Sequence, residues 1–283
     1  RDLLYAEPFF IWGLVHLYLV HLYLVHLYLV QVYKTLYNTR MKILIGIPVY
    51  NEEKHISKVL EEVYKYPYDI LVVDDGSTDA TPKILKSFQV EVIRHEKNHG
   101  VGRTLQGMFQ WADEHRYDWL ITLDSDGQHD PGEIADFVQR IEYDDVDIIS
   151  GSRYFEMHPD NDMPPKEREA INRQVTVELN DSLGVQITDT FTGYKAYRVG
   201  SLPVFDIDVD GYAFPIQFWV QAASKSLRVK EIPVRMIYND PNRTFGGQLD
   251  DPVKRLDHYR AVLCNELSKN AHAPPNALEH APC

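Results

Sequence analysis

The 283-residue sequence has few cysteines and too little positive charge for some classes of protein. Its only cysteines are Cys264 and Cys283, the latter being the last residue. Two cysteines so placed predict neither a disulfide framework nor a cysteine-based metal site, and a reducing compartment is expected. Lys and Arg number 29 against 42 Asp and Glu, giving a formal net charge of −13. A nucleic-acid binder needs a basic surface to meet phosphate charge, so this balance argues against nucleic acid as a partner.

Long uncharged runs are also lacking, except near the front of the chain. Residues 9–33 carry no formal charge, and between 16 and 30 they repeat the five residues HLYLV three times. About 20 apolar residues are enough to span a bilayer as a helix, and the basic residues after this run would mark a cytoplasmic side. A period of five, however, matches neither a helix nor a strand. The run therefore has two interpretations, a membrane anchor or a translated repeat without a structural role.

The start of the chain favours the second interpretation. The sequence begins with Arg1, and Met41 directly precedes a strand-like apolar run. We expect the functional protein to begin at or near Met41, with residues 1–40 an upstream extension. A membrane anchor and a folded part of the main domain are the alternatives.

Residues 41–153 alternate between two kinds of pattern. Strand-like segments lie at 43–49, 69–75, 90–95, 118–124 and 146–153. The first of them is a continuous apolar run, as expected of a strand buried on both faces. The segments between them carry apolar residues at helical spacing. This order predicts an α/β fold with a doubly wound, mainly parallel sheet and a Rossmann-like nucleotide-binding half. Ligands of such sheets bind at the carboxyl ends of the strands, where this sequence has its polar clusters.

The most informative cluster is an acidic turn after the fourth apolar run. Asp124 and Asp126 stand one residue apart and are followed by Gln128 and His129. Carboxylate and amide oxygens suit Mg²⁺ or Mn²⁺, an ion that can also hold a diphosphate. His129 is a candidate nitrogen ligand. Taken alone, the same residues also fit a solvated turn that caps the next helix.

Two further strand ends carry charge. Asp74 and Asp75 end the second run, where an aspartate can accept a hydrogen bond from a base or a ribose; the alternative is a cap on the following helix. Arg153 ends the fifth run and could neutralise a diphosphate. Its alternative is a surface arginine paired with one of the many carboxylates.

Together these motifs resemble glycosyltransferase family 2, whose members have the GT-A fold. The ordered segments are IPVYNEE (47–53), VVDDGSTDAT (72–81), NHGVG (98–102), LDSDGQHDP (123–131) and SGSRY (150–154). A later segment, DTFTGYKAYR (189–198), is similar to the branch of dolichyl-phosphate mannosyltransferases and bacterial polyprenyl-phosphate glycosyltransferases. Five motifs in the right order are far more specific than any one of them.

The resemblance implies a role for each matching residue. Pro48, Tyr50 and Glu52 would contact the base and ribose of the donor, and Asp74 or Asp75 would fix the base. The metal ligands would be Asp124, Asp126 and Gln128, with Ser125 beside them in the donor site. The residues nearest the chemistry would be Asp126, Arg153 and Asp189, the last on the acceptor side. The family's late Gly-x-Ser-Lys loop is replaced here, and Arg243 is its basic substitute.

The implied reaction is a metal-dependent transfer of a hexose, with inversion, from a nucleoside diphosphate sugar such as GDP-mannose or UDP-glucose to polyprenyl or dolichyl phosphate. One alternative acceptor is a hydroxyl of a saccharide or small molecule in cell-envelope synthesis, with Asp189 as general base. The other alternative is a sugar-nucleotide-binding module without activity. The absence of a Glu-Asp dipeptide base favours a phosphate acceptor. Cations available for that phosphate are Arg168, Arg173, Lys195, Arg198 and Arg243.

The remaining expectations concern organisation. One domain is expected over 41–267, with a nucleotide-sugar half (41–153) and an acceptor half (154–267), followed by a disordered tail (268–283). An amphipathic helix over 164–183 would lie beside the acceptor cleft. A second helix, 252–267, would pack on the domain or pair with a second subunit as a homodimer. The expected location is the cytoplasm, with peripheral contact at the inner face of the membrane.

Overall fold

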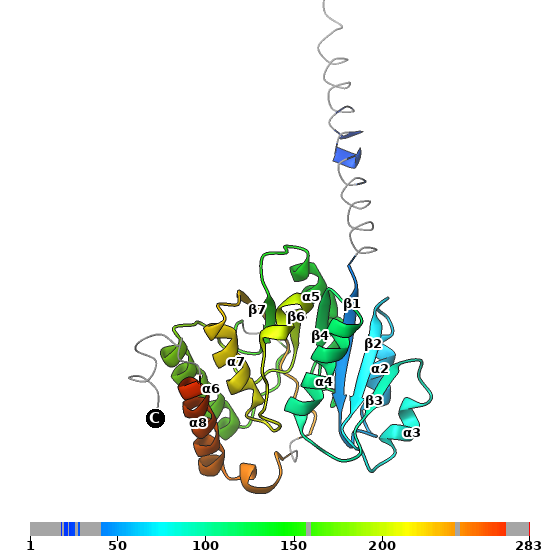
Figure 1. The fold of residues 1–283 in the computed structure, drawn as a ribbon. Coiled ribbons are helices and arrows are strands. Elements are labelled where there is room, and N and C mark those ends of the chain that lie inside the picture. The colour runs from blue at the N-terminus through cyan, green and yellow to red at the C-terminus, as the bar shows by residue number, and fades with distance from the viewer. Residues whose placement is uncertain are drawn as a thin grey trace, which may run out of the picture. The chain divides into compact units, whose positions relative to one another are not determined.

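The computed structural model describes residues 41–156, 160–240, 244–269 and 283, together with helical residues 18, 20, 21, 23–25 and 28. The chain divides into two compact units, Arg1–Lys42 and Ile43–Cys283. Most of the apolar repeat lies outside the described residues, so its interpretation stays a prediction. The fold of interest is that of the second unit (Figure 1).

Strands and helices alternate along the first part of this unit. In chain order the elements are β1 (Ile43–Val49), α2 (Ile56–Val63), β2 (Asp69–Asp74), α3 (Thr81–Leu85), β3 (Glu91–Arg94), α4 (Val101–Glu114), β4 (Trp119–Thr122), the 3₁₀ helix η1 (Pro131–Glu133), α5 (Ile134–Ile141) and β5 (Ile148–Ser152). All five predicted strands are present, with slightly shorter ends.

The second part of the unit is richer in helix. It comprises α6 (Lys166–Leu183), β6 (Lys195–Arg198), η2 (Val199–Val204), α7 (Phe214–Ser224), β7 (Val229–Pro233), η3 (Gly247–Asp250) and α8 (Pro252–Lys269). The helices predicted at 164–183 and 252–267 correspond to α6 and α8. Among the described residues, no helix combines the length and hydropathy that crossing a bilayer requires.

All strands join one sheet in the order β3-β2-β1-β4-β6-β5-β7. Every pairing is parallel except those of β6, which runs antiparallel to β4 and β5. The prediction of a mainly parallel α/β sheet is therefore confirmed. Because β6 runs the other way, its first residue, Lys195, lies beside Thr122 of β4 and Ser150 of β5. The entry to β6 thus meets the edge where the parallel strands end.

A buried apolar cluster joins the sheet to α4, α6, α7 and α8. Its members include Leu44, Leu120, Met108, Leu179, Phe218 and Leu263. In α8, Tyr259, Leu263 and Leu267 share a buried face, and this helix packs on α6 and α7. Of the two predictions for α8, packing on the domain is therefore confirmed.

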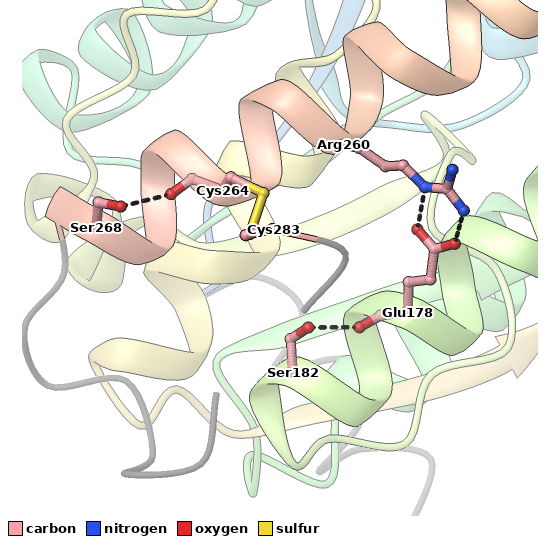
Figure 2. Close-up of a disulfide and its surroundings, with 6 residues drawn as sticks. All are labelled: Glu178, Ser182, Arg260, Cys264, Ser268 and Cys283. Atoms are coloured by element: carbon pink, nitrogen blue, oxygen red, sulfur yellow. Dashed lines mark hydrogen bonds and ion pairs between the residues drawn. A yellow bond between two sulfur atoms is a disulfide. The ribbon is translucent and has the colours of Figure 1, made fainter. Parts of the chain in front are cut away.

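The cysteines depart from expectation, because Cys264 of α8 is disulfide-bonded to Cys283 (Figure 2). The two residues were judged too few for a framework, yet the chain end returns to α8 and leaves their Cα atoms 5.7 Å apart. Arg260 fixes the same helix to α6, since its Nε donates to Glu178 at 3.1 Å. Most of the predicted tail, 270–282, lies outside the described residues.

A buried carboxyl in η1 makes the stability of the fold depend on pH. Glu133 Oε1 accepts the Arg235 backbone N–H at 2.6 Å, while Oε2 is buried without a hydrogen-bond partner. Burial raises the pKa of Glu133 from 4.5 to about 7. Its contribution to stability is therefore complete below pH 4.5 and is lost as the pH rises through 7.

We expect Glu133→Gln to stabilise the protein at pH 8 by about 2 kcal/mol, less than the full pKa shift implies because solvent partly reaches the carboxyl. The glutamine keeps the acceptor for Arg235 and removes the charge. Urea unfolding at pH 5 and pH 8 measures the effect, with a much larger gain in the free energy of unfolding at pH 8. The exposed Glu61→Gln is the control. Equal effects of Glu133→Gln at both pH values would contradict the prediction.

Candidate active site

A cavity of about 510 Å³ opens where the parallel strands end. Residues that follow β1, β2, β4 and β5 line one part of it, and the entry to β6 lines another. The remaining wall comes from the start of α4 and from α6, α7 and α8. The polar strand ends predicted to meet at one edge of the sheet do meet there.

The first strand end supplies residues expected to contact the donor. Pro48, Tyr50 and Glu52 all line the cavity. Tyr50 is 43% exposed and Glu52 only 7%, and the Glu52 backbone N–H donates to Thr81 Oγ1 at 2.9 Å. Ser125 lies beneath, with its hydroxyl donating to the Pro48 carbonyl at 2.7 Å. Ser125 therefore ties the acidic turn to the end of β1.

The two aspartates after β2 have different surroundings. Asp75 lines the cavity and accepts the backbone N–H of Gly100 at 2.7 Å and His95 Nδ1 at 2.7 Å. Asp74 is fully buried and accepts the Ser77 backbone N–H at 2.8 Å. Asp75 is thus the one of the two that lines the cavity. The predicted helix cap is not seen, because the N-cap of α3 is Ala80 and no side chain caps it; Asp74 instead closes the turn before that helix.

The acidic turn brings Asp124, Asp126 and Gln128 into the cavity. Gly127 allows the turn, because its φ of 75° lies in the left-handed region. Asp126 Oδ1 accepts the Gln128 backbone N–H at 2.9 Å. His129 has another use: its buried Nδ1 accepts the Asp124 backbone N–H at 3.0 Å, and burial lowers its pKa to about 4. His129 is therefore a neutral support of the turn, and its Nδ1 is taken.

The residues of the turn fit a divalent cation. Two carboxylates and an amide oxygen form a hard donor set of the kind that Mg²⁺ and Mn²⁺ take, with positions left for water or a diphosphate. The Asp124 side chain is 40% exposed, so its carboxylate is open to a ligand from the cavity. Within the described part of the chain, no three His, Cys, Asp or Glu side chains are arranged to hold a metal. The site would therefore be completed by Gln128 and by the donor itself.

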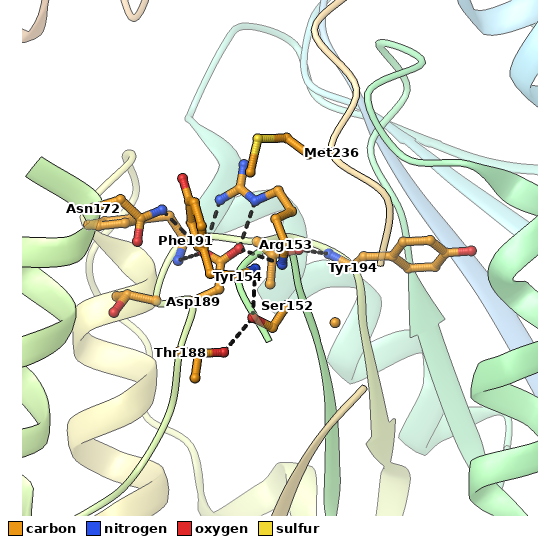
Figure 3. A network of polar contacts seen from close by, with 12 residues as sticks. Ser152, Arg153, Tyr154, Asn172, Thr188, Asp189, Phe191, Tyr194 and Met236 are labelled. Atoms are coloured by element: carbon orange, nitrogen blue, oxygen red, sulfur yellow. Dashed lines mark hydrogen bonds and ion pairs between the residues drawn. The ribbon is translucent and has the colours of Figure 1, made fainter. Parts of the chain in front are cut away.

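Arg153 and Asp189 form a buried ion pair (Figure 3). Arg153 Nε donates to Asp189 Oδ2 at 2.7 Å and Nη2 to Oδ1 at 2.9 Å. Asn172 Nδ2 lies 3.2 Å from the same carboxylate. Burial opposes the ionisation of Asp189, but the charge of Arg153 outweighs it and lowers the pKa of Asp189 to about 2. Arg153 lines the cavity, whereas Asp189 is fully buried behind it.

This geometry argues against Asp189 as a general base. From the sequence, Asp189 was expected to line the acceptor side of the site and, if the acceptor is a hydroxyl, to act as general base. A carboxylate held by two hydrogen bonds to a guanidinium is a weak base, because proton uptake would break a strong buried pair. Asp189 instead orients Arg153.

The predicted phosphate-binding cations separate into two groups. Arg168 and Lys195 line the cavity; the Lys195 ammonium donates to the Thr192 carbonyl, and burial lowers its pKa to about 8. Arg173 is exposed and pairs with Glu169 at 2.9 Å on the same helix. Arg198 lies 4.8 Å from the Trp119 ring and fixes the far end of β6. Arg243 falls outside the described residues.

Residues 44–204, more than half of the chain, match the sequence model of glycosyl transferase family 2. The chain belongs to this family. The undecaprenyl-phosphate mannosyltransferase of Micrococcus luteus is 29% identical over 77% of this chain and 94% of that protein. The UDP-N-acetylglucosamine–dolichyl-phosphate N-acetylglucosaminyltransferase of Methanococcus voltae is 31% identical over 72% of this chain and 89% of that protein. The resemblance to the polyprenyl-phosphate branch is confirmed, and the protein is a glycosyltransferase.

Solved structures agree on the fold. A glucosyl-3-phosphoglycerate synthase from Mycobacterium tuberculosis, in complex with Mn²⁺, UDP and glucosyl-3-phosphoglycerate, superposes with a TM-score of 0.60 at 17% identity. The match covers 83% of this chain and 81% of that one. The fold of this glycosyltransferase is therefore GT-A.

The wall of the cavity formed by α6 and α8 holds a cation that was not predicted from the sequence, Arg255. Arg255 is 3% exposed and lines the cavity, and its guanidinium lies 4.5 Å from the Phe245 ring centroid. Arg168 lies 4.8 Å from the same centroid, so Phe245 is clamped between two cations. A signal was available: Arg255, Tyr259 and Leu263 are spaced by four, which places Arg255 on the buried face of α8.

Proposed function

We propose that this glycosyltransferase moves a hexose from a nucleoside diphosphate sugar to a polyprenyl or dolichyl phosphate, with inversion at the anomeric carbon. One observation carries the proposal. The carboxylate expected to act as base for a hydroxyl acceptor, Asp189, is buried and paired with Arg153. The acceptor end of the cavity instead carries Arg168 and Arg255. The names of the polyprenyl-phosphate relatives support the same acceptor.

The chemistry follows from the acceptor. An anionic phosphate oxygen attacks the anomeric carbon, the bond from that carbon to the diphosphate oxygen breaks, and the nucleoside diphosphate departs with the electron pair. No proton has to be removed, so no general base is needed. Arg153, held by Asp189, would donate hydrogen bonds to the departing diphosphate. A divalent cation held by Asp124, Asp126 and Gln128 would neutralise further charge there.

A lipid phosphate also determines where the reaction takes place. Its headgroup lies at the bilayer surface, so the acceptor end of the cavity would face the membrane on its cytoplasmic side. Two apolar side chains in the segment between β5 and α6 are suitably exposed, Phe155 at 42% and Met163 at 85%. Peripheral contact of this kind needs no spanning helix.

The test is transfer from several labelled donors, namely GDP-mannose, UDP-glucose and UDP-N-acetylglucosamine, with Mn²⁺. Each donor is incubated with the full chain and either a polyprenyl phosphate, the matching polyprenol or a simple glycan. We expect organic-extractable label with the phosphate only. Label in the glycan would support the hydroxyl alternative. Nucleotide binding without any transfer would indicate a binding module.

The acceptor cations provide a further prediction. Removing Arg168 by Arg168→Ala is expected to raise the KM for polyprenyl phosphate about 10-fold, since a charge-assisted hydrogen bond is lost, and to leave the donor KM unchanged. The control is Arg173→Ala on the same helix, because Arg173 also stacks on an aromatic ring, at 4.9 Å from that of Tyr154. An equal rise in both variants would argue against a specific role for Arg168.

A further inference from the structure

Glu231 lies in β7, outside the cavity lining, and is 7% exposed. Both of its carboxylate oxygens accept the Thr188 backbone N–H at 2.9 Å. Oε2 also accepts the Thr188 hydroxyl at 3.0 Å, and Oε1 accepts the Asp189 backbone N–H at 3.3 Å. The carboxylate of Glu231 therefore binds the backbone of the Thr188–Asp189 segment, which lies before β6.

The Thr188–Asp189 segment holds Arg153 in place through hydrogen bonds. Asp189 holds the guanidinium of Arg153 through two hydrogen bonds and its backbone N–H through a third, at 3.2 Å. The Thr188 hydroxyl lies 2.5 Å from Ser152 Oγ, at the end of the strand that leads into Arg153 (Figure 3). The segment bound by Glu231 therefore contacts both Arg153 itself and Ser152, the residue before it.

Burying Glu231 beside Asp189 works against stability. Removal from water and the neighbouring negative charge of Asp189 both disfavour the ionised carboxylate. A neutral pairing of the same backbone groups would avoid this cost. This arrangement is costly for folding and supports Arg153, a side chain in the cavity. Such costs are typical of functional sites.

We propose that Glu231 is a positioning residue: it fixes the Thr188–Asp189 segment so that Asp189 holds Arg153 toward the diphosphate of the donor. This inference rests on the proposed function only in taking a nucleoside diphosphate sugar as donor. It does not depend on which acceptor is used. Glu231 itself touches no substrate and acts through Asp189 and Arg153.

A double-mutant cycle on nucleotide binding tests the inference. The full chain is prepared as wild type, Glu231→Gln, Asp189→Asn and the double variant, and binding of GDP and UDP is measured by calorimetry with Mn²⁺. Glu231→Gln keeps the size of the side chain but points an amide N–H at backbone donors. We expect it to weaken binding about 10-fold, and the double variant to bind no more weakly than Asp189→Asn, because both substitutions break one chain of contacts.

The matched control is Glu266→Gln, since Glu266 is likewise a buried glutamate outside the cavity lining, but its partner is Lys269 on α8. It is expected to change the melting temperature and to leave nucleotide affinity unchanged. If Glu231→Gln fails to fold, Thr188→Val removes only the hydroxyl contacts and should weaken binding in the same direction. Additive effects in the cycle, or unchanged affinity in these variants, would overturn the inference. If the wild-type protein binds nucleotide but transfers no sugar to the lipid phosphate, only the proposed acceptor is overturned.

Discussion

Replacing Asp126 by asparagine is expected to lower glycosyl transfer roughly 100- to 1,000-fold, the range found when one group that stabilises developing charge is lost. Asp126 is only 6% exposed and lines the cavity, so its carboxylate can face a cation bound there. Asparagine keeps the shape and removes that charge. The metal-assisted binding of the donor diphosphate should weaken with it.

Mn²⁺ binding is the direct measurement, made by electron paramagnetic resonance with and without UDP or GDP. Asp130→Asn is the control, because Asp130 lies in the same loop and its Oδ1 caps η1 by accepting the Gly132 backbone N–H at 2.8 Å. Asparagine caps a helix as well as aspartate does, so this variant should bind Mn²⁺ normally. Wild-type Mn²⁺ affinity in Asp126→Asn would remove the metal assignment.

The parts of this protein that could be predicted are those specified by local sequence. The runs 43–49 and 69–75 read as strands because a parallel strand buried on both faces must be continuously apolar. Once those strands are parallel, their polar ends share one edge. Tyr50, Asp75 and Asp126 were therefore expected near one another and do line one cavity.

The parts that were missed depend on contacts between distant segments. β6 spans only Lys195–Arg198, a strand too short and too charged to show an apolar run. Arg153 and Asp189 are separated by 36 residues, and both were singled out, but no local pattern says that they pair. Because they do pair, Asp189, which was predicted as a base for a hydroxyl acceptor, instead holds the guanidinium of Arg153. Cys264 and Cys283 were likewise not expected to pair, because two cysteines make no framework and nothing local in the sequence says that residues 19 positions apart lie together.

The same distant contacts make a glycine in the entry to β6 decisive for the position of Asp124, a proposed metal ligand. A Cβ built on Gly193 would lie 2.7 Å from Asp124 Oδ1 and 3.3 Å from its Cγ. The backbone there has little freedom to retreat, since the Gly193 carbonyl accepts the Thr122 hydroxyl at 2.7 Å and the Lys195 ammonium holds the Thr192 carbonyl. In Gly193→Ala the carboxylate of Asp124 must therefore move.

We expect Gly193→Ala to weaken Mn²⁺ binding in the presence of UDP or GDP about 100-fold, at the upper end for groups that orient a metal ligand, and to lower transfer to a similar extent. Gly200→Ala is the matched control, because a Cβ at that position meets nothing within 4 Å. Paramagnetic resonance of Mn²⁺ and a melting curve separate a displaced ligand from a damaged fold. Normal Mn²⁺ affinity in Gly193→Ala would mean that Asp124 can rotate away and still serve the metal. Weak Mn²⁺ binding with an unchanged melting temperature would mean that the segment entering β6 sets the position of a metal ligand carried by the turn after β4.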